Sequence, residues 1–267
     1  MKARPILFNA PMVRALLDDR KTQTRRIIKP PGKWGAQFPI CAPGLMAADH
    51  QVWWHGEETE KVGVAADCPY GAPGDLLIVR ETFLLPNTVG GLKPREVHPS
   101  EGVHYVADGE PHGDVWDRKC PAIHMPRWAS RLTLEITDVR VERLQDISEA
   151  DAIAEGLYKS FPDDEDRAWF DAHYEDEGRK PTPEEWAQFE EGVWMVPGVP
   201  QGWGMTKAER RRDTWGPTPQ FCYRLLWEHI NGPDSWAANP WVWAVSSKVH
   251  RANVDQLLAA APRPEAA

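Results

Sequence analysis

The sequence RLTLEITDVRV occupies residues 131–141 and predicts a strand that changes phase. Apolar and polar residues alternate strictly from Leu132 to Ile136, which is the period of a strand with one buried face. From Val139 onward the apolar residues continue on the opposite parity. Because a slip of one residue moves every side chain to the other face, this pattern predicts a β-bulge or a tight turn near Thr137.

Shorter strands are expected on both sides of this stretch. Residues 5–8 (PILF) form a short apolar run, and residues 76–79 (LLIV) form another directly after a turn at residues 71–75 (GAPGD). Residues 239–245 (NPWVWAV) are apolar on both faces. This last stretch therefore predicts a strand in the centre of a sheet or of a closed barrel.

Three helices are expected between the strands. The first begins at the N-cap Asn9 and ends near residue 19, and the second begins at the N-cap Ser148 and stops at Gly156. The third covers residues 218–230, where an apolar stripe ends at an Asn-Gly-Pro sequence. Since helices and strands do not alternate regularly, the pattern predicts an α+β fold around a small barrel.

The charge of the chain is distributed unevenly. The 267 residues include 31 Lys and Arg against 40 Asp and Glu, a net charge of −9 that argues against unselective binding to phosphate backbones. However, residues 1–31 have eight basic and two acidic side chains (+6), whereas residues 158–200 have four basic and twelve acidic ones (−8). The basic arm is therefore compatible with an anionic ligand.

The acidic segment predicts a separate part of the chain. Residues 158–216 contain five Trp residues, too many for a solvated acidic tract, and are expected to be an insertion or lid, partly helical around residues 183–189. A loosely packed excursion without a role is the alternative. Residues 31–66 and 85–118 are expected to be long loops. The predicted organisation is a body over 1–157, the insertion over 158–216, a helix and closing strand over 217–250, and a flexible tail over 251–267.

Several classes of protein are not expected. The four cysteines, which are Cys41, Cys68, Cys120 and Cys222, include no close pair and are interpreted as ordinary thiols of a reducing compartment. No CxxC, HxxxH, GxGxxG, Walker or GxSxG spacing is present, so we expect no metal and no cofactor. The sequence has no signal peptide and no membrane span of about 18 apolar residues, which predicts a cytoplasmic protein without membrane contact.

Residues 19–26 (DRKTQTRR) directly follow the first predicted helix and contain most of the reactive side chains. In a structural interpretation, the cations complement the helix dipole and the Thr-x-Thr spacing suits a strand. In a functional interpretation, Lys21, desolvated or next to three arginines, loses its proton readily and accepts the proton of a threonine hydroxyl. Both interpretations remain open for this stretch alone.

Glu155 is a second candidate for chemistry. It is expected in the last turn of its helix, where a carboxylate faces the negative end of the dipole at a cost of about 0.3–1 kcal/mol. Because a glutamate is unfavourable at this position, we interpret it as a candidate functional residue. A partly dry pocket would raise the pKa of its carboxyl toward neutrality, which suits a general acid or base. An exposed, solvated glutamate is the alternative interpretation.

The order of these motifs resembles the ASCH domain of the PUA-like β-barrel superfamily. The resemblance covers roughly residues 1–30, 68–84, 128–157 and 237–247. The whole chain is similar to ASCH-type proteins of bacteriophages and prophages, with the hallmarks CPYG at 68–71, IHMPRWAS at 123–130 and NPWVW at 239–243. The resemblance implies a small β-barrel with flanking helices and long insertions.

The resemblance also implies catalytic residues. Many ASCH domains have Gly-x-Lys-x-x-Glu-x-Arg after the first helix and are suspected nucleic-acid readers, whereas this chain has Asp19 and Thr24 in place of the Gly and Glu. In this it resembles a small bacterial ASCH enzyme that hydrolyses N4-acetylcytidine. That likeness implies Thr24 as nucleophile, Lys21 as its base and Glu155 as proton donor to the leaving amine. Arg26 would hold the loop or an anionic group of the substrate.

Five further residues are candidates for substrate binding. Arg25 is a basic contact for an oligonucleotide. Arg80 and Glu81 would place a charged pair at the barrel mouth, or form an ion pair at a strand edge. His124 and Trp128 offer a surface on which unpaired bases stack, or belong to a packed loop.

Three functions are compatible with these features. The first is an amidohydrolase-like enzyme that removes an acyl group from a modified cytidine or a related base. The second is a non-catalytic module that binds RNA or DNA, with RNA favoured. The third is a phage accessory protein whose insertion at 158–216 contacts another protein. The expected partners are thus a nucleoside or nucleic acid and a second protein, in the host cytoplasm if the chain is encoded by a phage.

Overall fold

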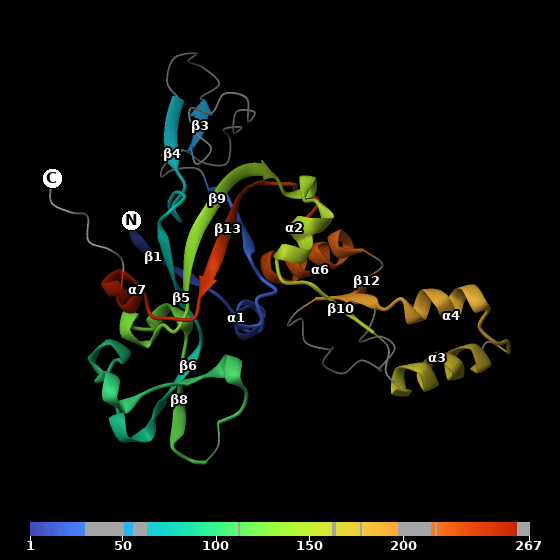
Figure 1. Ribbon diagram of the computed structural model, residues 1–267, viewed down its shortest axis with the longest axis horizontal. Helices are drawn as coiled ribbons and strands as arrows, with labels where there is room; N and C mark the ends of the chain where they lie inside the picture. Colours follow the sequence, from blue (N-terminus) through green and yellow to red (C-terminus); the bar gives the residue numbers. More distant parts are fainter. Residues whose placement is uncertain are drawn as a thin grey trace. The chain divides into compact units, whose positions relative to one another are not determined.

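The computed structural model describes residues 1–29, 51–55, 63–111, 113–161, 164–176, 178–196, 215–216 and 218–260. The chain divides into two compact units. Unit 1 comprises Met1–Asp146 and Asn239–Ala267, and unit 2 comprises Ile147–Ala238. Each unit contains both helices and strands, so the fold is α+β (Figure 1).

A five-stranded sheet with the order β1-β5-β9-β13-β2 forms the centre of unit 1. β1 is parallel to β5, and the other neighbours are antiparallel. β9 and β13 lie side by side as the longest pair (Figure 1). Because β13 has a partner on each side, the prediction of a central strand over 239–245 is confirmed. The strands are β1 (Ala3–Leu7), β2 (Gln23–Ile27), β5 (Leu76–Arg80), β9 (Thr133–Arg143) and β13 (Trp241–His250).

A closed barrel, which the sequence led us to expect, is not found in the described part of the chain. β1 and β2 are the two edges of the sheet, and no backbone pair joins them there. Arg26 Nη2 instead donates a hydrogen bond to the carbonyl oxygen of Leu7, at 2.9 Å. The edges are thus linked by a side chain rather than by strand pairing, and the sheet is open.

The predicted change of phase in β9 is a β-bulge. The register between β9 and β13 shifts between Ser246 and Ser247, and this leaves Thr137 without a partner on β13. Because of the extra residue, Ile136 and Val139 point to the same face of the sheet although they are three positions apart, and both are buried. The prediction of a bulge is confirmed, and one continuous apolar face is the result.

Helix α1 (Ala10–Leu17) begins and ends where the sequence predicted. The side chain of the N-cap Asn9 accepts a hydrogen bond from the backbone of Met12, at 3.0 Å. The apolar side of α1 is buried. The C-cap of the helix is Asp18. Asp19 then takes a left-handed conformation, with φ of 56°, that ends the helix.

A second, smaller sheet of unit 1 has the order β7-β6-β8. Its strands and short 3-10 segments occupy most of the stretch 85–118, where we expected a loop; each piece is too short to show a period in the sequence. The elements are β6 (Phe83–Pro86), η2 (Asn87–Val89), η3 (Pro94–Glu96), η4 (Pro99–Glu101), β7 (His104–Tyr105), η5 (Val106–Asp108), β8 (Trp116–Cys120), η6 (Ala122–His124) and η7 (Arg127–Ala129).

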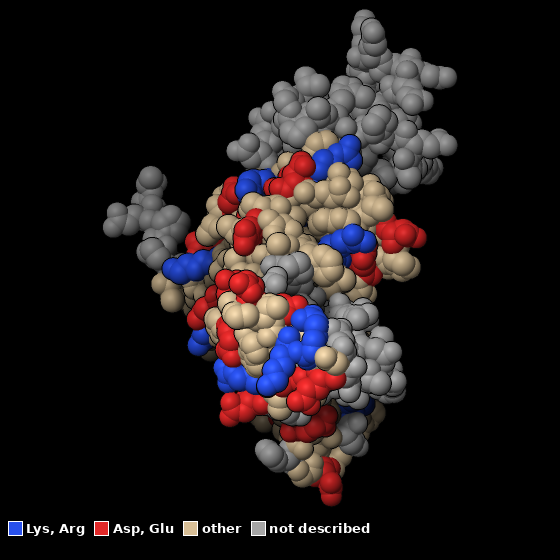
Figure 2. Space-filling model, turned by 90° about the vertical axis from the view of Figure 1, so that its right-hand side faces the viewer, with Lys and Arg blue, Asp and Glu red and all other residues tan. Residues whose placement is uncertain are grey.

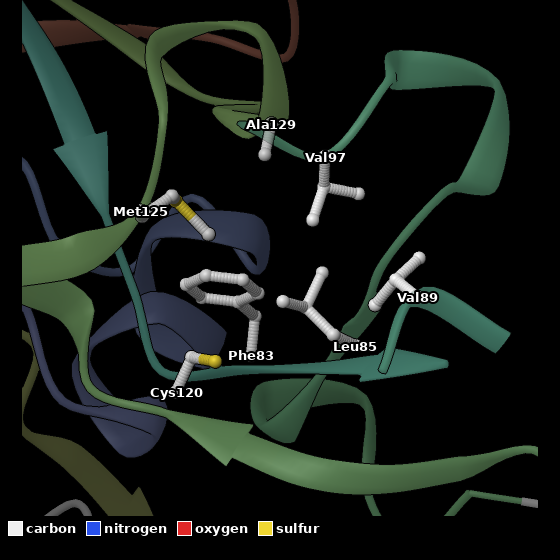
Figure 3. Packing of buried hydrophobic residues seen from close by; sticks show 7 residues of the cluster. All are labelled: Phe83, Leu85, Val89, Val97, Cys120, Met125 and Ala129. Atoms are coloured by element: carbon white, nitrogen blue, oxygen red, sulfur yellow. The ribbon is translucent and has the colours of Figure 1, made fainter. Parts of the chain in front are cut away.

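This smaller sheet encloses a core of its own. Figure 3 shows its buried side chains pointing toward one another from β6, β8 and the 3-10 segments around them. All seven side chains belong to residues that are at most 8% exposed, so the cluster is a buried apolar core. The residues are Phe83, Leu85, Val89, Val97, Cys120, Met125 and Ala129.

Unit 1 contains two further elements. β3 (Gln51–His55) and β4 (Gly63–Asp67) form an antiparallel pair within the predicted loop 31–66, most of which lies outside the described residues. Helix α7 (Val254–Ala260) lies within the predicted flexible tail, and its first residue packs, fully buried, against Ile78. The tail prediction is therefore wrong for this helix, because a tertiary contact orders it.

Unit 2 contains four described helices and a three-stranded sheet with the order β10-β11-β12. The predicted N-cap Ser148 accepts a hydrogen bond from the backbone of Asp151, and the predicted helix around 183–189 is α4. None of the described helices of the chain has the length and apolarity needed to span a membrane. The elements are α2 (Glu149–Ala154), β10 (Tyr158–Ser160), α3 (Asp164–Asp176), α4 (Pro183–Glu190), β11 (Val193–Met195), β12 (Trp215–Gly216) and α6 (Pro219–Asn231).

Ion pairs link the helices α3 and α4 and the turn before α4. Arg167 of α3 makes two hydrogen bonds to Glu190 of α4, at 2.7 and 2.9 Å. Arg179 makes two to Glu185, at 2.8 and 2.9 Å. Figure 2 shows basic and acidic side chains next to one another on the face that it draws. The acidity of this segment is thus partly neutralised by its own arginines.

We predict that the carboxyl of Glu185 titrates far below an ordinary glutamate. Hydrogen bonds from Arg179 and from the backbone of Thr182 hold its pKa at about 2. This stabilisation is fully present above the ordinary pKa of about 4.3 and is lost as the pH falls toward 2. NMR titration of side-chain carboxyl signals in the full chain measures it.

The Arg179→Gln variant is the control, since it should return the Glu185 titration toward the ordinary value. A Glu185 signal that titrates near pH 4.3 in the unmodified chain would contradict this ion pair.

Candidate functional site

Lys21 is a buried lysine at the junction between α1 and β2. The backbone N–H groups of Arg20 and Lys21 both donate to the carbonyl of Ala15, at 2.9 and 3.0 Å, so the chain turns sharply after the helix. The Lys21 residue is only 2% exposed. Its Nζ donates to the carbonyl oxygen of Gln23 at 2.9 Å and lies 5.7 Å from the centre of the Phe8 ring.

Thr24 directly follows the residue whose carbonyl binds this amine. The carbonyl that accepts the hydrogen bond from Lys21 belongs to the peptide group that joins Gln23 to Thr24. Thr24 is buried in β2 and is paired with Val245 of β13, so its side chain shares a face of the sheet with that apolar residue. The structure therefore places a buried amine and a buried hydroxyl residue one peptide unit apart.

Arg26 belongs to the same face of the sheet as Thr24, because the two are two positions apart in β2. Its guanidinium carbon lies 5.3 Å from the centre of the Phe8 ring, the ring that Lys21 also approaches. Two basic side chains thus approach one aromatic ring, whose residue lies between β1 and α1 in the chain. The resulting group of Lys21, Thr24, Arg26 and Phe8 is called the β2 cluster below.

Arg25 points to the opposite face of the sheet. Its residue is 4% exposed, its Nε donates to Glu142 Oε1 at 2.8 Å, and its Nη1 donates to Gln23 Oε1 at 2.5 Å. This network between β2 and β9 neutralises the guanidinium within unit 1. The structure therefore separates Arg25 from the β2 cluster and gives it a structural role, which differs from the substrate contact that the sequence predicted.

Glu155 lies at the C-terminal end of its helix in unit 2, directly before Gly156, as predicted. It is the C-cap of α2, and Gly156 follows with a φ of 104°. The Glu155 residue is 4% exposed, and its Oε1 accepts a hydrogen bond from the hydroxyl of Tyr223 at 3.4 Å. The interpretation of an exposed, solvated glutamate is thus wrong. Lys21 and Thr24 belong to unit 1, whereas Glu155 belongs to unit 2.

Arg80 and Glu81 do not pair with each other. Arg80 Nη1 donates to the carbonyl of Ile123 at 3.2 Å. Glu81, which is 1% exposed, accepts two hydrogen bonds from Arg131 at 2.9 and 3.0 Å, and Arg131 also binds Asp108. Burial raises the pKa of Glu81, against the opposing effect of Arg131. No local sequence pattern indicates that Arg131 is the partner of Glu81, because fifty residues separate the two.

His124 and Trp128, the residues proposed to stack on bases, differ in exposure. His124 is exposed in η6. Trp128 is half-buried and packs against the cluster of Figure 3. The adjacent Arg127 makes a two-pronged ion pair with Asp255 of α7, with Nε and Nη2 to Oδ1 distances of 3.0 and 2.8 Å. For Trp128, the packed-loop interpretation therefore agrees with the structure.

The basic N-terminal arm is largely engaged within unit 1. Arg4 pairs with Asp75 at 2.8 Å, and Arg14 donates to the carbonyl of Ala107 at 3.1 Å. Cys68, Cys120 and Cys222 are buried and form no disulfide among the described residues, while Cys41 lies outside the described residues. Within the described ranges, no three His, Cys, Asp or Glu side chains come together as a metal site would require.

Comparison of the chain with protein-family models, with curated proteins and with solved structures found no match.

We predict that Glu81 contributes to the stability of unit 1 through Arg131. Glu81→Ala removes a buried carboxylate and leaves the half-buried guanidinium of Arg131 with one acidic partner, Asp108. The free energy of unfolding should fall by about 2–4 kcal/mol, measured by urea denaturation. Asp18→Ala, which removes an exposed pair with Arg20, should change it by less than about 1 kcal/mol. Equal effects of the two substitutions would contradict this role.

Proposed function

We propose that this chain is an amidohydrolase-like enzyme of the ASCH, PUA-like type that removes an acyl group from a modified cytidine or a related base. The observation that carries the proposal is the buried amine of Lys21 bound to the peptide group beside Thr24. Lysine is among the residues least often fully buried, and a desolvated amine suits activation of a nucleophile. The motif order of the ASCH enzyme that acts on N4-acetylcytidine supports the same assignment.

In the proposed reaction, Thr24 Oγ attacks the carbonyl carbon of the acyl group while Lys21 Nζ, in its neutral form, takes the hydroxyl proton. The carbon–nitrogen bond to N4 of the base then breaks. The acyl group remains on Thr24 as an ester, and the amine leaves with a proton supplied by an acid. Water hydrolyses the ester, so the products are a carboxylic acid, the free amine of the base and regenerated Thr24.

Glu155 is the proposed proton donor to the leaving amine. The assignment follows from the resemblance and from its place at the end of α2, and a buried carboxyl suits acid–base work. Arg26 is proposed to hold the substrate, because it shares the face of Thr24. Arg25 has no part in the proposed chemistry, since Glu142 and Gln23 already bind it.

Nucleic-acid binding without catalysis is less well supported. Non-specific affinity for phosphate backbones comes from cations that are available to the ligand. In unit 1, however, Arg4 pairs with Asp75 and Arg25 with Glu142. The positive charge of the N-terminal arm is thus smaller at the surface than in the sequence.

We predict that the full chain releases cytidine and acetate from N4-acetylcytidine. Thr24→Val removes the proposed nucleophile at nearly constant volume, and Lys21→Met removes the proposed base with its hydrocarbon stem retained. Each should lower kcat by about 100-fold or more. The measurement is chromatography of the nucleoside products together with an acetate assay.

Two matched substitutions control for folding and for the loss of a surface group. Thr22→Val and Lys29→Met change exposed residues on either side of β2 and should leave the rate within about twofold of the unmodified chain. Circular dichroism should show the same helix and strand content for all four variants. Absence of turnover on every acylated cytidine, nucleotide and oligonucleotide tested would refute the proposed activity.

Glu155 is tested separately. Glu155→Gln keeps the shape and one hydrogen-bond acceptor but cannot deliver a proton, so kcat should fall by about 100-fold while KM stays within about threefold. Glu149→Gln, at an exposed position of the same helix, is the matched control. Full activity of Glu155→Gln would remove Glu155 from the mechanism without affecting the assignment of Lys21 and Thr24.

A further inference from the structure

Tyr223 is a buried tyrosine of unit 2 that contacts the carboxyl of Glu155. It lies in α6, is 2% exposed, and its hydroxyl donates to Glu155 Oε1 at 3.4 Å. The two residues are 68 positions apart and belong to different helices, both within unit 2. Buried carboxylates require hydrogen-bond partners, and a phenol is a neutral donor that leaves the charge of the carboxylate unchanged.

The ring of Tyr223 is held by two other aromatic side chains of unit 2. Trp236 lies 6.2 Å away between ring centres and nearly edge-on, at 72°. Trp227, one turn further along α6, lies 6.2 Å away at 47°. Both separations fall in the range of aromatic pairs, and the nearly edge-on arrangement with Trp236 is a favoured one. The hydroxyl is therefore held in a defined position relative to the helix.

The backbone of Glu155 is also held. Its N–H donates to the carbonyls of Asp151 at 3.0 Å and Ala152 at 3.2 Å, in the last turn of α2. Gly156 takes a left-handed φ of 104°, which ends the helix directly after the carboxylate. Hydrogen bonds therefore hold both the backbone of Glu155 and its Oε1.

We propose that Tyr223 is a positioning residue for Glu155: its hydroxyl holds Oε1, aims the carboxyl, and stabilises the carboxylate that remains after the proton has been given to the leaving amine. This inference rests on the proposed function through the role of Glu155. Tyr223 itself forms and breaks no covalent bond. A hydrogen bond to the ionised form of an acid makes that acid a better proton donor.

The test is Tyr223→Phe, which keeps the ring and removes only the hydroxyl. A net hydrogen bond of about 0.5–1.5 kcal/mol corresponds to a fall in kcat of roughly 2- to 12-fold, and KM should stay within about twofold. A fall in kcat without a change in KM distinguishes positioning of the acid from a loss of substrate binding.

Tyr105→Phe is the matched control. Tyr105 is a partly buried tyrosine of unit 1 whose hydroxyl donates to the carbonyl of Ala129 at 2.9 Å. Its substitution also removes one hydrogen-bonded hydroxyl and should leave kcat and KM unchanged. If both substitutions gave the same kinetic change, the inference would be overturned.

A measurement without substrate separates this inference from the proposed function. In the full chain labelled with 13C at glutamate carboxyls, the Glu155 signal is assigned by its loss in Glu155→Gln. At a fixed pH its chemical shift should change in Tyr223→Phe, which removes the hydroxyl that contacts the carboxyl, and should stay the same in Tyr105→Phe. A changed chemical shift supports the contact even if no acylated cytidine is hydrolysed, whereas an unchanged one overturns it even if hydrolysis is found.

Discussion

The pairing of β9 with β13 is the interaction on which the rest of unit 1 depends. These strands are the longest of the sheet. β5 pairs with β9 and β2 pairs with β13, while β1 joins the sheet by pairing with β5. The bulge at Thr137 lets β9 keep its apolar residues on one face over its whole length. Without the extra residue, Val139 would turn away from the core that Ile136 enters. The change of phase in the sequence near Thr137 is therefore needed for one continuous apolar face along β9.

The same alternation of faces in β2 places the structural residue Arg25 and the candidate site residues Thr24 and Arg26 on opposite faces of the sheet. Arg25 and Arg26 are neighbours in the sequence and look equivalent there. In the strand, however, one points to Glu142 and the other lies on the face of Thr24. A buried amine at the start of that strand then has a hydroxyl residue beside it and an aromatic ring near it. The candidate site is therefore a consequence of strand geometry.

Ion pairs within each unit reduce the surface charge that the composition of the basic arm and of the acidic insertion suggests. The basic arm and the acidic insertion have opposite net charges in the sequence. In the structure, Arg4 and Arg25 are matched by acidic partners from distant strands and turns, and Arg167 and Arg179 are matched within unit 2. Because partners come from separate parts of the chain, composition overstates the charge that a ligand encounters.

The sequence by itself determined the local structure of this protein: the caps at Asn9 and Ser148, the ends of α1 and α2, the bulge near Thr137 and the candidates Lys21, Thr24 and Glu155. Caps, turns and periodicity act over a few residues, so they are visible in the chain. Only the tertiary structure decided the open sheet, the order in α7, the partner of Glu81 and the contact of Tyr223 with Glu155. Those features depend on residues far apart in sequence, and no local pattern specifies which distant residue comes near.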